Sequence, residues 1–497
     1  MQARVHLDTE HHVGAIDRRI FGGFLEHLGR AIYEGVYDPG NPLSDERGFR
    51  RDVIESLRSL DMPVIRYPGG NFVSTYNWQD GVGPREKRPA RPDYAWKSIE
   101  SNQFGTDEFM AWCATLQAQP MLAVNLGTEG TAKAAQLLEY TNLPGDTYWA
   151  AQRIANGRAD PYAVKYWCLG NEMDGPWQAG HVPANIYAQR AEQAAVVMRG
   201  LDPTIETVVC GSSHHQMPTY MDWDRLVLDY CWDQVDYISA HQYSSNSRQD
   251  SAWFLAEGVM VDRIVDDYAA LLAYVRAVKR SPKRVYLSFD EWNVWYRERS
   301  GDGNWQQAPH LLEEHYNLED ALVCAQYLAS FIRHADVVKM ACIAQIVNAI
   351  AVVCTKSDGL LQQSIYHAFQ LFSRHAHGRS LRPAVACPTY HAGDRGEVPT
   401  LDVAASYDPA TETASVFLIN RGLGEEADVT IGIADRKIDS VPAVHLLGGD
   451  VHAGNTWHKP NAVVPEHGEA RLPGDGTARV RVPAPGLAVV QLRLGRR

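Results

Sequence analysis

Residues 163–177 read AVKYWCLGNEMDGPW, an apolar run that ends at Asn171 and Glu172 and is then broken by Gly175-Pro176. An apolar run of this length, bounded by turn residues, predicts a strand that is buried on both faces, as in a parallel sheet. The polar end of the run then predicts that Asn171 and Glu172 lie at the carboxyl edge of that sheet. A carboxylate at this edge is a first indication of a reactive site.

Seven further apolar runs share this pattern, and amphipathic helical segments separate most of them. The runs lie at 17–25, 62–70, 119–127, 206–212, 235–243, 284–292 and 337–345. Helices are predicted at 45–60, 106–118, 183–200 and 317–335, the last with Asn317 as its N-cap residue. Eight such units predict a (β/α)8 barrel. A doubly wound open sheet is the alternative, but the sequence lacks the G-x-G-x-x-G or Walker A pattern typical of that fold.

The pattern of polar and apolar residues changes after about residue 380. Short segments of alternating polar and apolar residues follow one another with turns between them, which predicts an antiparallel β-sandwich. The opening residues ARVHLDT alternate in the same way and are expected to add a strand to it. We therefore expect a catalytic barrel over 16–379 and an accessory sandwich formed by 1–15 together with 380–497.

Composition and charge narrow the class of protein. The chain has 497 residues, 45% of them hydrophobic, which is typical of an ordered globular protein. Its 47 basic and 60 acidic residues give a net charge of −13, which argues against a nucleic acid or an anionic membrane as partner. A neutral substrate is expected. The N-terminus has no apolar signal-peptide core, which predicts a cytoplasmic protein.

The cysteines and the longest apolar stretch are expected to be buried. The eight cysteines form no C-x-x-C pair, so we expect reduced thiols. The apolar stretch 337–354 is interrupted by Lys339, Gln345 and Asn348, so a buried strand that ends in a polar site fits better than a membrane span.

Polar residues at the ends of the predicted strands are the candidate site residues, because the carboxyl ends of barrel strands carry the reacting groups. They are Glu26, Arg66, Asn71, Asn125, Asn171, Glu172, His241, Tyr243, Glu291, Trp295, Gln345 and Asn348. Glu172 and Glu291 match in kind, since each is a carboxylate at the end of an apolar run with Asn or Trp beside it. Two carboxylates that face each other across a barrel mouth are what glycoside hydrolysis requires.

The two carboxylates would have different roles in the reaction. A retaining reaction needs carboxyl groups about 5 to 5.5 Å apart, one as nucleophile and one as acid and base. Like charges at that separation do not both ionise easily, so one group is expected to keep a proton and act as the acid. Arg66, if it reaches Glu291, is expected to hold that residue ionised.

Structural roles and other chemistries were weighed against this interpretation. A single glutamate at a strand end is more often a capping or ion-pairing residue than a catalyst. Asp174 and Asp290 are assigned to structure, Asp290 because strand alternation places it on the opposite face from Glu291. The histidines have no metal-ligand spacing, and neither a metal nor another cofactor is expected. No G-x-S-x-G sequence is present, which removes the commonest signature of a serine hydrolase.

Six motifs together resemble the family-51 glycoside hydrolases, the α-L-arabinofuranosidases. They occur in the family's order between residues 17 and 350, and they are FGGFLEHLGRAIYEGVYDPG, RYPGGNFVSTYNW, CLGNEMDGPWQ, SAHQY, FDEWNVWY and ACIAQIVN. The resemblance implies a retaining double displacement in which Glu172 is the general acid/base and Glu291 is the nucleophile. It also implies a jelly-roll-like accessory domain with a structural role, and assembly as a hexamer.

The resemblance further implies roles for the surrounding residues. Glu26, Asn71 and Asn171 would bind the hydroxyl groups of an arabinofuranose. Arg66 and Tyr243 would keep the nucleophile charged and oriented, and His241 would line the same pocket. Trp295 and Gln345 would close the pocket, and Trp96 would form a wall near the leaving group. The segments 127–130 and 354–369 depart from the family's pattern near strand ends.

The expected activity is therefore the removal of terminal α-L-arabinofuranosyl residues from arabino- or arabinoxylo-oligosaccharides in the cytoplasm. One alternative keeps the fold and the mechanism but acts as a galactofuranosidase, a β-xylosidase or an endo-glucanase. Another, from a different class, is a sugar-binding protein without catalysis. The presence of both carboxylates speaks against it.

Overall fold

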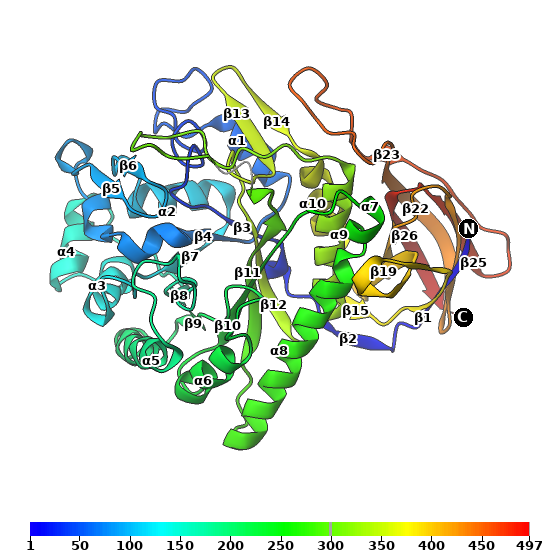
Figure 1. Ribbon diagram of the computed structural model, residues 1–497, viewed down its shortest axis with the longest axis horizontal. Helices are drawn as coiled ribbons and strands as arrows, with labels where there is room; N and C mark the ends of the chain where they lie inside the picture. Colours follow the sequence, from blue (N-terminus) through cyan, green and yellow to red (C-terminus); the bar gives the residue numbers. More distant parts are fainter. Residues whose placement is uncertain (298–300, 497) are drawn as a thin grey trace.

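The computed structural model describes residues 1–297 and 301–496, and it divides visibly into a barrel and a pair of sheets (Figure 1). Eight parallel strands close into a barrel in chain order. All eight strands predicted from the sequence are confirmed. They are β3 (Gly22–Phe24), β4 (Val64–Tyr67), β7 (Gln119–Ala123), β8 (Tyr166–Leu169), β9 (Glu206–Val209), β10 (Tyr237–Ser244), β11 (Tyr286–Val294) and β12 (Val338–Ala344).

Helices surround this barrel and cover its strands. The four predicted helices are present, and the Oδ1 atom of Asn317 accepts a hydrogen bond from the backbone of Asp320, as expected of an N-cap. The helices are α1 (Arg51–Arg58), α2 (Thr106–Leu116), α3 (Thr131–Asn142), α4 (Tyr148–Ala155), α5 (Ala184–Leu201), α6 (Asp222–Cys231), α7 (Ser251–Phe254), α8 (Glu257–Lys279), α9 (Leu318–Arg333) and α10 (Ser364–His375).

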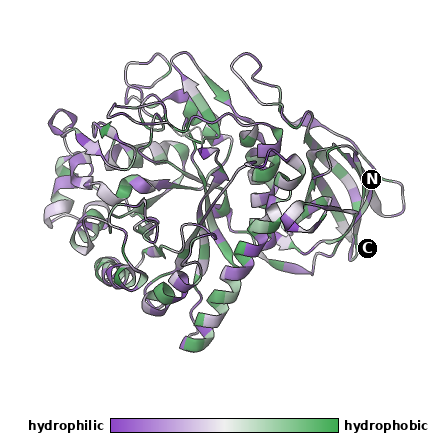
Figure 2. Ribbon diagram, in the orientation of Figure 1, coloured by the Kyte–Doolittle hydropathy of each residue, from purple (hydrophilic) through white to green (hydrophobic). Residues whose placement is uncertain are grey.

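Helices α8 and α9 differ in how they are buried. Hydrophilic and hydrophobic residues alternate along α8, which presents only one side to the barrel (Figure 2). Every residue of α9 from Leu318 to Ile332 is buried, because this helix is packed between the barrel and the second set of sheets. Burial on all sides is expected of a helix packed between two layers in this way.

The remaining strands form two sheets that face each other across a separate apolar core. The termini lie together at this end of the molecule (Figure 1). One sheet holds β16 (Ala384–Ala386), β1 (Gln2–Leu7), β21 (Ala427–Ile433), β25 (Thr477–Val482) and β24 (Ala470–Arg471). The other holds β2 (His12–Ala15), β15 (Arg379–Leu381), β19 (Leu401–Asp408), β20 (Thr413–Asn420), β26 (Gly486–Arg496), β22 (Arg436–Gly448) and β23 (Glu466–His467).

The sandwich contains the expected strand from the N-terminus. Strand β1 joins the sheet, and it runs parallel to β21 while the other pairs are antiparallel. Neighbours joined by a short turn are antiparallel by necessity, and β1 comes from the opposite end of the chain, so no turn imposes that direction on it. The antiparallel sandwich expected from the sequence is present, and the β1–β21 pair is its one parallel pairing among the described strands.

Three two-stranded hairpins complete the fold. They are β5 (Arg91–Asp93) with β6 (Ser98–Glu100), β13 (Val353–Lys356) with β14 (Gly359–Gln362), and β17 (Thr389–His391) with β18 (Glu397–Pro399). Among the helices described, none combines the length and the apolar character that crossing a bilayer requires.

Candidate active site

The turn after β8 places Glu172 at the mouth of the barrel. The backbone leaves the strand with a φ of +92° at Gly170 and a φ of +43° at Glu172 itself. Positive φ is uncommon for a residue with a side chain, and it is concentrated at functional sites where surrounding contacts enforce it. Here Trp177, from the same loop, donates a 2.6 Å hydrogen bond from Nε1 to the Oε2 atom of Glu172.

Glu291, near the end of β11, faces Glu172 across the mouth of the barrel. A carboxylate oxygen of each residue and a ring nitrogen of His241 all lie within 4.8 Å of one another. Arg66 on β4 donates a 2.6 Å hydrogen bond to Oε1 of Glu291, and the Tyr243 hydroxyl donates a 3.0 Å bond to Oε2. Both oxygens of Glu291 are therefore held, and the two carboxyl groups are too close to admit the water of an inverting reaction.

His241, on β10, joins Glu172 to Asp290. Its Nδ1 atom lies 3.0 Å from Oε1 of Glu172, and its Nε2 atom lies 3.0 Å from Oδ1 of Asp290. The assignment of Asp290 to a structural position away from the site was wrong. The pairing of β11 shifts register between Phe289 and Trp292, so the regular alternation of side chains fails at this point.

The charges of this cluster shift the pKa of each member. Burial opposes protonation of the His241 ring, but Glu291, Asp290 and Glu172 together raise its pKa to about 10. Burial raises the pKa of Glu291 even though His241 and Arg66 act to lower it. Burial also acts to raise the pKa of Glu172, but hydrogen bonds from His241 and Trp177 outweigh it and lower that pKa. The His241 imidazolium therefore lies against the Glu172 carboxylate.

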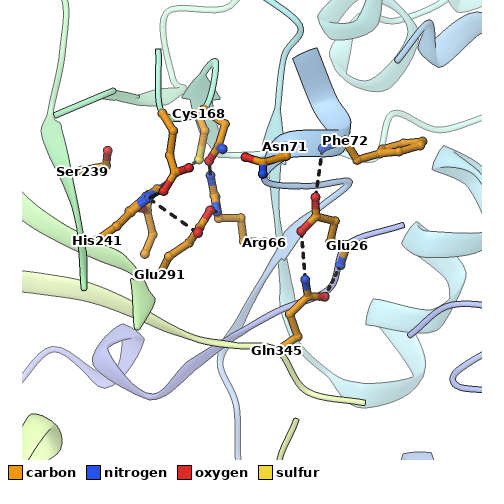
Figure 3. Close-up of polar contacts among 12 residues, drawn as sticks. Glu26, Arg66, Asn71, Phe72, Cys168, Ser239, His241, Glu291 and Gln345 are labelled. Atoms are coloured by element: carbon orange, nitrogen blue, oxygen red, sulfur yellow. Dashed lines mark hydrogen bonds and ion pairs between the residues drawn. The ribbon is translucent and has the colours of Figure 1, made fainter. Parts of the chain in front are cut away.

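A second group of side chains builds a pocket beside the carboxylates (Figure 3). Oε1 of Glu26 accepts hydrogen bonds from the backbone of Phe72 at 2.9 Å and from the Trp96 indole at 3.0 Å. Gln345 donates to Oε2 of Glu26 at 2.9 Å, and its own oxygen accepts from the Glu26 backbone. Burial, with a smaller effect of Glu291, raises the pKa of Glu26 to about 8. Asn71 lies between the two groups.

These side chains open into one cleft of about 900 Å³. Its inner wall consists of Glu26, Asn71, Trp96, Glu172, Trp177, Tyr243, Glu291, Trp295 and Gln345. Arg66, Asn171 and His241 lie beneath this wall and are only 1–3% exposed. Arg66 contacts Asn171 as well as Glu291, with Nη2 2.6 Å from the Asn171 Oδ1 atom.

The comparison with known proteins agrees with this arrangement. Sequence models of the α-L-arabinofuranosidase 1 domain and the α-L-arabinofuranosidase C-terminal domain match residues 56–259 and 290–485. An intracellular exo-α-(1→5)-L-arabinofuranosidase of Acetivibrio thermocellus is 47% identical over 433 residues, which cover 86% of each chain. An exo-α-(1→6)-L-arabinofuranosidase of Bifidobacterium longum is 41% identical and covers 99% of this chain and 97% of its own.

A solved structure extends the similarity to the whole fold. A family 51 α-L-arabinofuranosidase from Bifidobacterium longum superimposes with a TM-score of 0.95 at 36% identity, over 99% of each chain. The chain belongs to the family-51 α-L-arabinofuranosidases. The agreement covers both the barrel and the sandwich, so the resemblance inferred from six motifs extends over the full length of the chain.

Two predicted site residues of this family-51 protein, Asn125 and Asn348, belong neither to the cleft wall nor to the hydrogen-bonded group beneath it. Asn125 accepts hydrogen bonds from the backbone of residues 127 and 128 and so stabilises its own turn. Asn348 donates to the Arg30 carbonyl and to Thr355. The divergent segments 127–130 and 354–369 contribute no residue to the cleft wall that the structure describes.

Sequence reasoning missed two side chains that contact the candidate residues of this family-51 site. Trp177 contacts Glu172 directly, and Asp290 contacts His241. The position of Trp177, five residues after Glu172 and past a Gly-Pro turn, was a signal for a loop folded back over the strand end. For Asp290 the only signal was its place beside Glu291, since a register shift cannot be read from the sequence.

The site also contains a set of potential metal ligands. Glu172, His241 and Glu291 are close enough to share an ion by distance. However, Arg66 already places a positive charge 2.6 Å from Glu291. A divalent cation would be repelled by this guanidinium, so the donor set fits a proton-transfer site better than a metal site.

Proposed function

We propose that this protein is a retaining, exo-acting α-L-arabinofuranosidase that releases terminal arabinofuranosyl residues from arabino- or arabinoxylo-oligosaccharides. The observation that carries the proposal is the pair Glu172 and Glu291, with carboxylate oxygens within 4.8 Å and with a different set of hydrogen bonds on each. The relatives named for this activity support the choice of sugar.

In the first step Glu291 attacks the anomeric carbon and the bond from that carbon to the leaving oxygen breaks. Arg66 and Tyr243 orient the Glu291 carboxylate by holding both of its oxygens. Glu172 gives a proton to the leaving oxygen, so that the leaving group departs as a neutral alcohol. The product of this step is a glycosyl ester of Glu291.

We infer that His241 supplies the proton for this step. His241 is protonated at neutral pH because the surrounding carboxylates raise its pKa to about 10. Transfer of one proton from Nδ1 across the 3.0 Å hydrogen bond to Oε1 makes Glu172 a carboxylic acid and His241 neutral. Asp290, at 3.0 Å from Nε2, holds the ring in the orientation for this transfer.

In the second step Glu172, now a carboxylate, removes a proton from water, and the oxygen of that water attacks the anomeric carbon. The ester bond to Glu291 breaks and arabinose leaves with its original configuration. During both steps Glu26, Asn71 and Asn171 bind the sugar hydroxyls, while Gln345, Trp96 and Trp295 close the pocket. Because Glu26 is neutral below pH 8, it is a hydrogen-bond donor to the sugar at physiological pH.

The location, the assembly, the domain division and the linkage also belong to the proposal. We place the protein in the cytoplasm, in keeping with the intracellular relatives, and expect a homo-oligomer, a hexamer by resemblance. We retain the domain division into 16–379 and 1–15 with 380–497. The linkage is left open, because relatives of similar identity are named for 1→5 and for 1→6 bonds.

The experiment is the release of 4-nitrophenol from the α-L-arabinofuranoside, beside the β-D-galactofuranoside and the β-D-xylopyranoside. We expect the arabinofuranoside to be hydrolysed fastest by the wild type and its hydrolysis to be lost in Glu291→Ala. Preference for another glycoside would favour the alternative specificities. Binding without hydrolysis would favour a sugar-binding protein, and an unaffected Glu291→Ala variant would contradict the site.

A further inference from the structure

The cleft extends well beyond the sugar pocket. Its volume of about 900 Å³ is near the upper end of the range of about 300–1,000 Å³ that small-molecule sites occupy. Under the proposed function, a single arabinofuranosyl residue would occupy the inner end, between Glu26 and Glu291. The outer wall is formed by Arg248, Trp253, Arg263, Asp394 and Arg395.

Part of this outer wall comes from the chain that follows the barrel. The hairpin β17–β18 carries the turn Gly393–Arg395 at its tip and packs on α7. The Tyr390 hydroxyl donates to the Ala252 carbonyl at 3.0 Å, and Nη1 of Arg395 donates to the Trp253 carbonyl at 2.8 Å. The accessory part of the chain thus contributes directly to the substrate cleft.

Hydrogen bonds and ring contacts fix the positions of Arg248, Asp394 and Trp253 on the outer wall. Arg248 and Asp394 form two hydrogen bonds, of 3.0 and 2.6 Å, and the Trp253 indole donates to Asp394 at 2.9 Å. The guanidinium carbons of Arg248 and Arg395 lie 4.4 and 3.9 Å from the centre of the Trp253 ring. Since these groups lie over the ring, we expect an outer sugar to bind through hydrogen bonds rather than by stacking on Trp253.

A purely structural role explains this cluster poorly. The side chains of Arg248 and Asp394 are 48% and 62% exposed, and an ion pair this exposed adds little to stability. Arg263 is also exposed on the cleft wall, and among the described residues no ion pair neutralises it. The outer wall of the cleft therefore offers hydrogen-bond donors on Arg248 and Arg263 and an acceptor on Asp394. These groups are available to the part of a substrate that lies beyond the cleaved bond.

We propose that Arg248, Arg263 and Asp394 form an outer leaving-group subsite that binds the second or third sugar beyond the cleaved bond. The ligand class is an oligosaccharide, because a guanidinium with several donors beside a carboxylate acceptor matches neighbouring sugar hydroxyls. The proposal rests on the proposed function. It adds that the enzyme prefers longer leaving groups and that the segment after the barrel contributes to this preference.

The test measures kcat/KM on linear arabino-oligosaccharides of two to five residues and on the 4-nitrophenyl arabinofuranoside, for the wild type, Arg248→Ala, Arg263→Ala and Asp394→Ala. The matched control is Arg225→Ala, an exposed arginine that is paired with Asp229 on α6, outside the cleft wall. Each cleft variant should lose about fivefold or more on the longer substrates, as expected for one hydrogen bond. The loss should grow with the length of the leaving group.

Equal losses on every substrate, or no loss at any length, would overturn the outer subsite. Thermal melting of each variant identifies a folding defect. If Arg248→Ala fails to fold, Arg263→Ala carries the test, because no ion pair described here depends on it. A wild type that is inactive on all arabinofuranosides would overturn the proposed function itself, a result distinct from an active enzyme without length preference.

Discussion

Arg66 on β4 donates a 2.6 Å hydrogen bond to Glu291 on β11, and both side chains are buried. This contact ties the proposed nucleophile to a fixed positive charge on the other side of the barrel. The same guanidinium also holds Asn171, the neighbour of Glu172. Arg66 thus contacts Glu291 directly and the neighbour of Glu172, so we expect its substitution to affect the chemistry at both carboxylates.

Arg66→Gln should shift the acid limb of the kcat/KM profile. Arg66 lowers the pKa of Glu291 against the effect of burial. Its removal raises that pKa further, so a smaller fraction of Glu291 is ionised at a given pH and the acid limb moves to higher pH. A pH–rate profile on the 4-nitrophenyl arabinofuranoside measures this. An unchanged limb would mean that Arg66 does not control the charge of Glu291.

Glu172→Ala should lose activity in proportion to how much the leaving group needs a proton. On oligosaccharides, whose leaving alcohols are poor, we expect a loss of about 10²–10⁴ in kcat/KM, which reports the first step, as is typical for general acid catalysis. On activated aryl glycosides the first step needs little assistance, so the loss should be far smaller. Equal losses on both substrate types would show that Glu172 is not the acid.

Glu26→Gln should remove a pH dependence near pH 8. The Glu26 pKa of about 8 means that the group is neutral below this pH and charged above it. Substrate binding by the neutral form should therefore weaken as the pH rises through 8, which lowers kcat/KM. The amide variant cannot ionise, and its profile should lack that limb even if its activity is reduced. A limb that persists in Glu26→Gln would assign the titration to another group.

Asp402→Ala should destabilise the junction of barrel and sandwich. Asp402 on β19 accepts from Arg333 of α9 at 2.8 Å and pairs with Arg421 at 3.0 Å. Removing the carboxylate leaves the buried Arg421 without an ion-pair partner among the described residues, a change that costs about 3–5 kcal/mol, while Arg333 keeps its pair with Asp262. Denaturant unfolding measures it. Asp229→Ala, which breaks the exposed pair with Arg225, is the control and should cost about 0–1 kcal/mol.

The sequence predicted the barrel well because its strands are continuous apolar runs with polar ends. Glu172 and Glu291 are found in this way, since each ends such a run. Asp290 was misplaced because the register of β11 shifts beside it, and such a shift depends on the neighbouring strand. Asn125 was chosen for the same strand-end position as Asn171, yet it turns back to its own loop. The position of a residue at a strand end predicts that it lies near the site. It does not predict the direction in which its side chain points.

The separation of Glu172 and Glu291 is the central claim, and the configuration of the product tests it most directly. We would let the enzyme act on the 4-nitrophenyl α-L-arabinofuranoside in aqueous methanol and identify the first methyl glycoside by proton NMR. The account predicts methyl α-L-arabinofuranoside, formed with retention through a Glu291 ester. The β-anomer as first product would contradict it, because inversion requires a nucleophile other than Glu291.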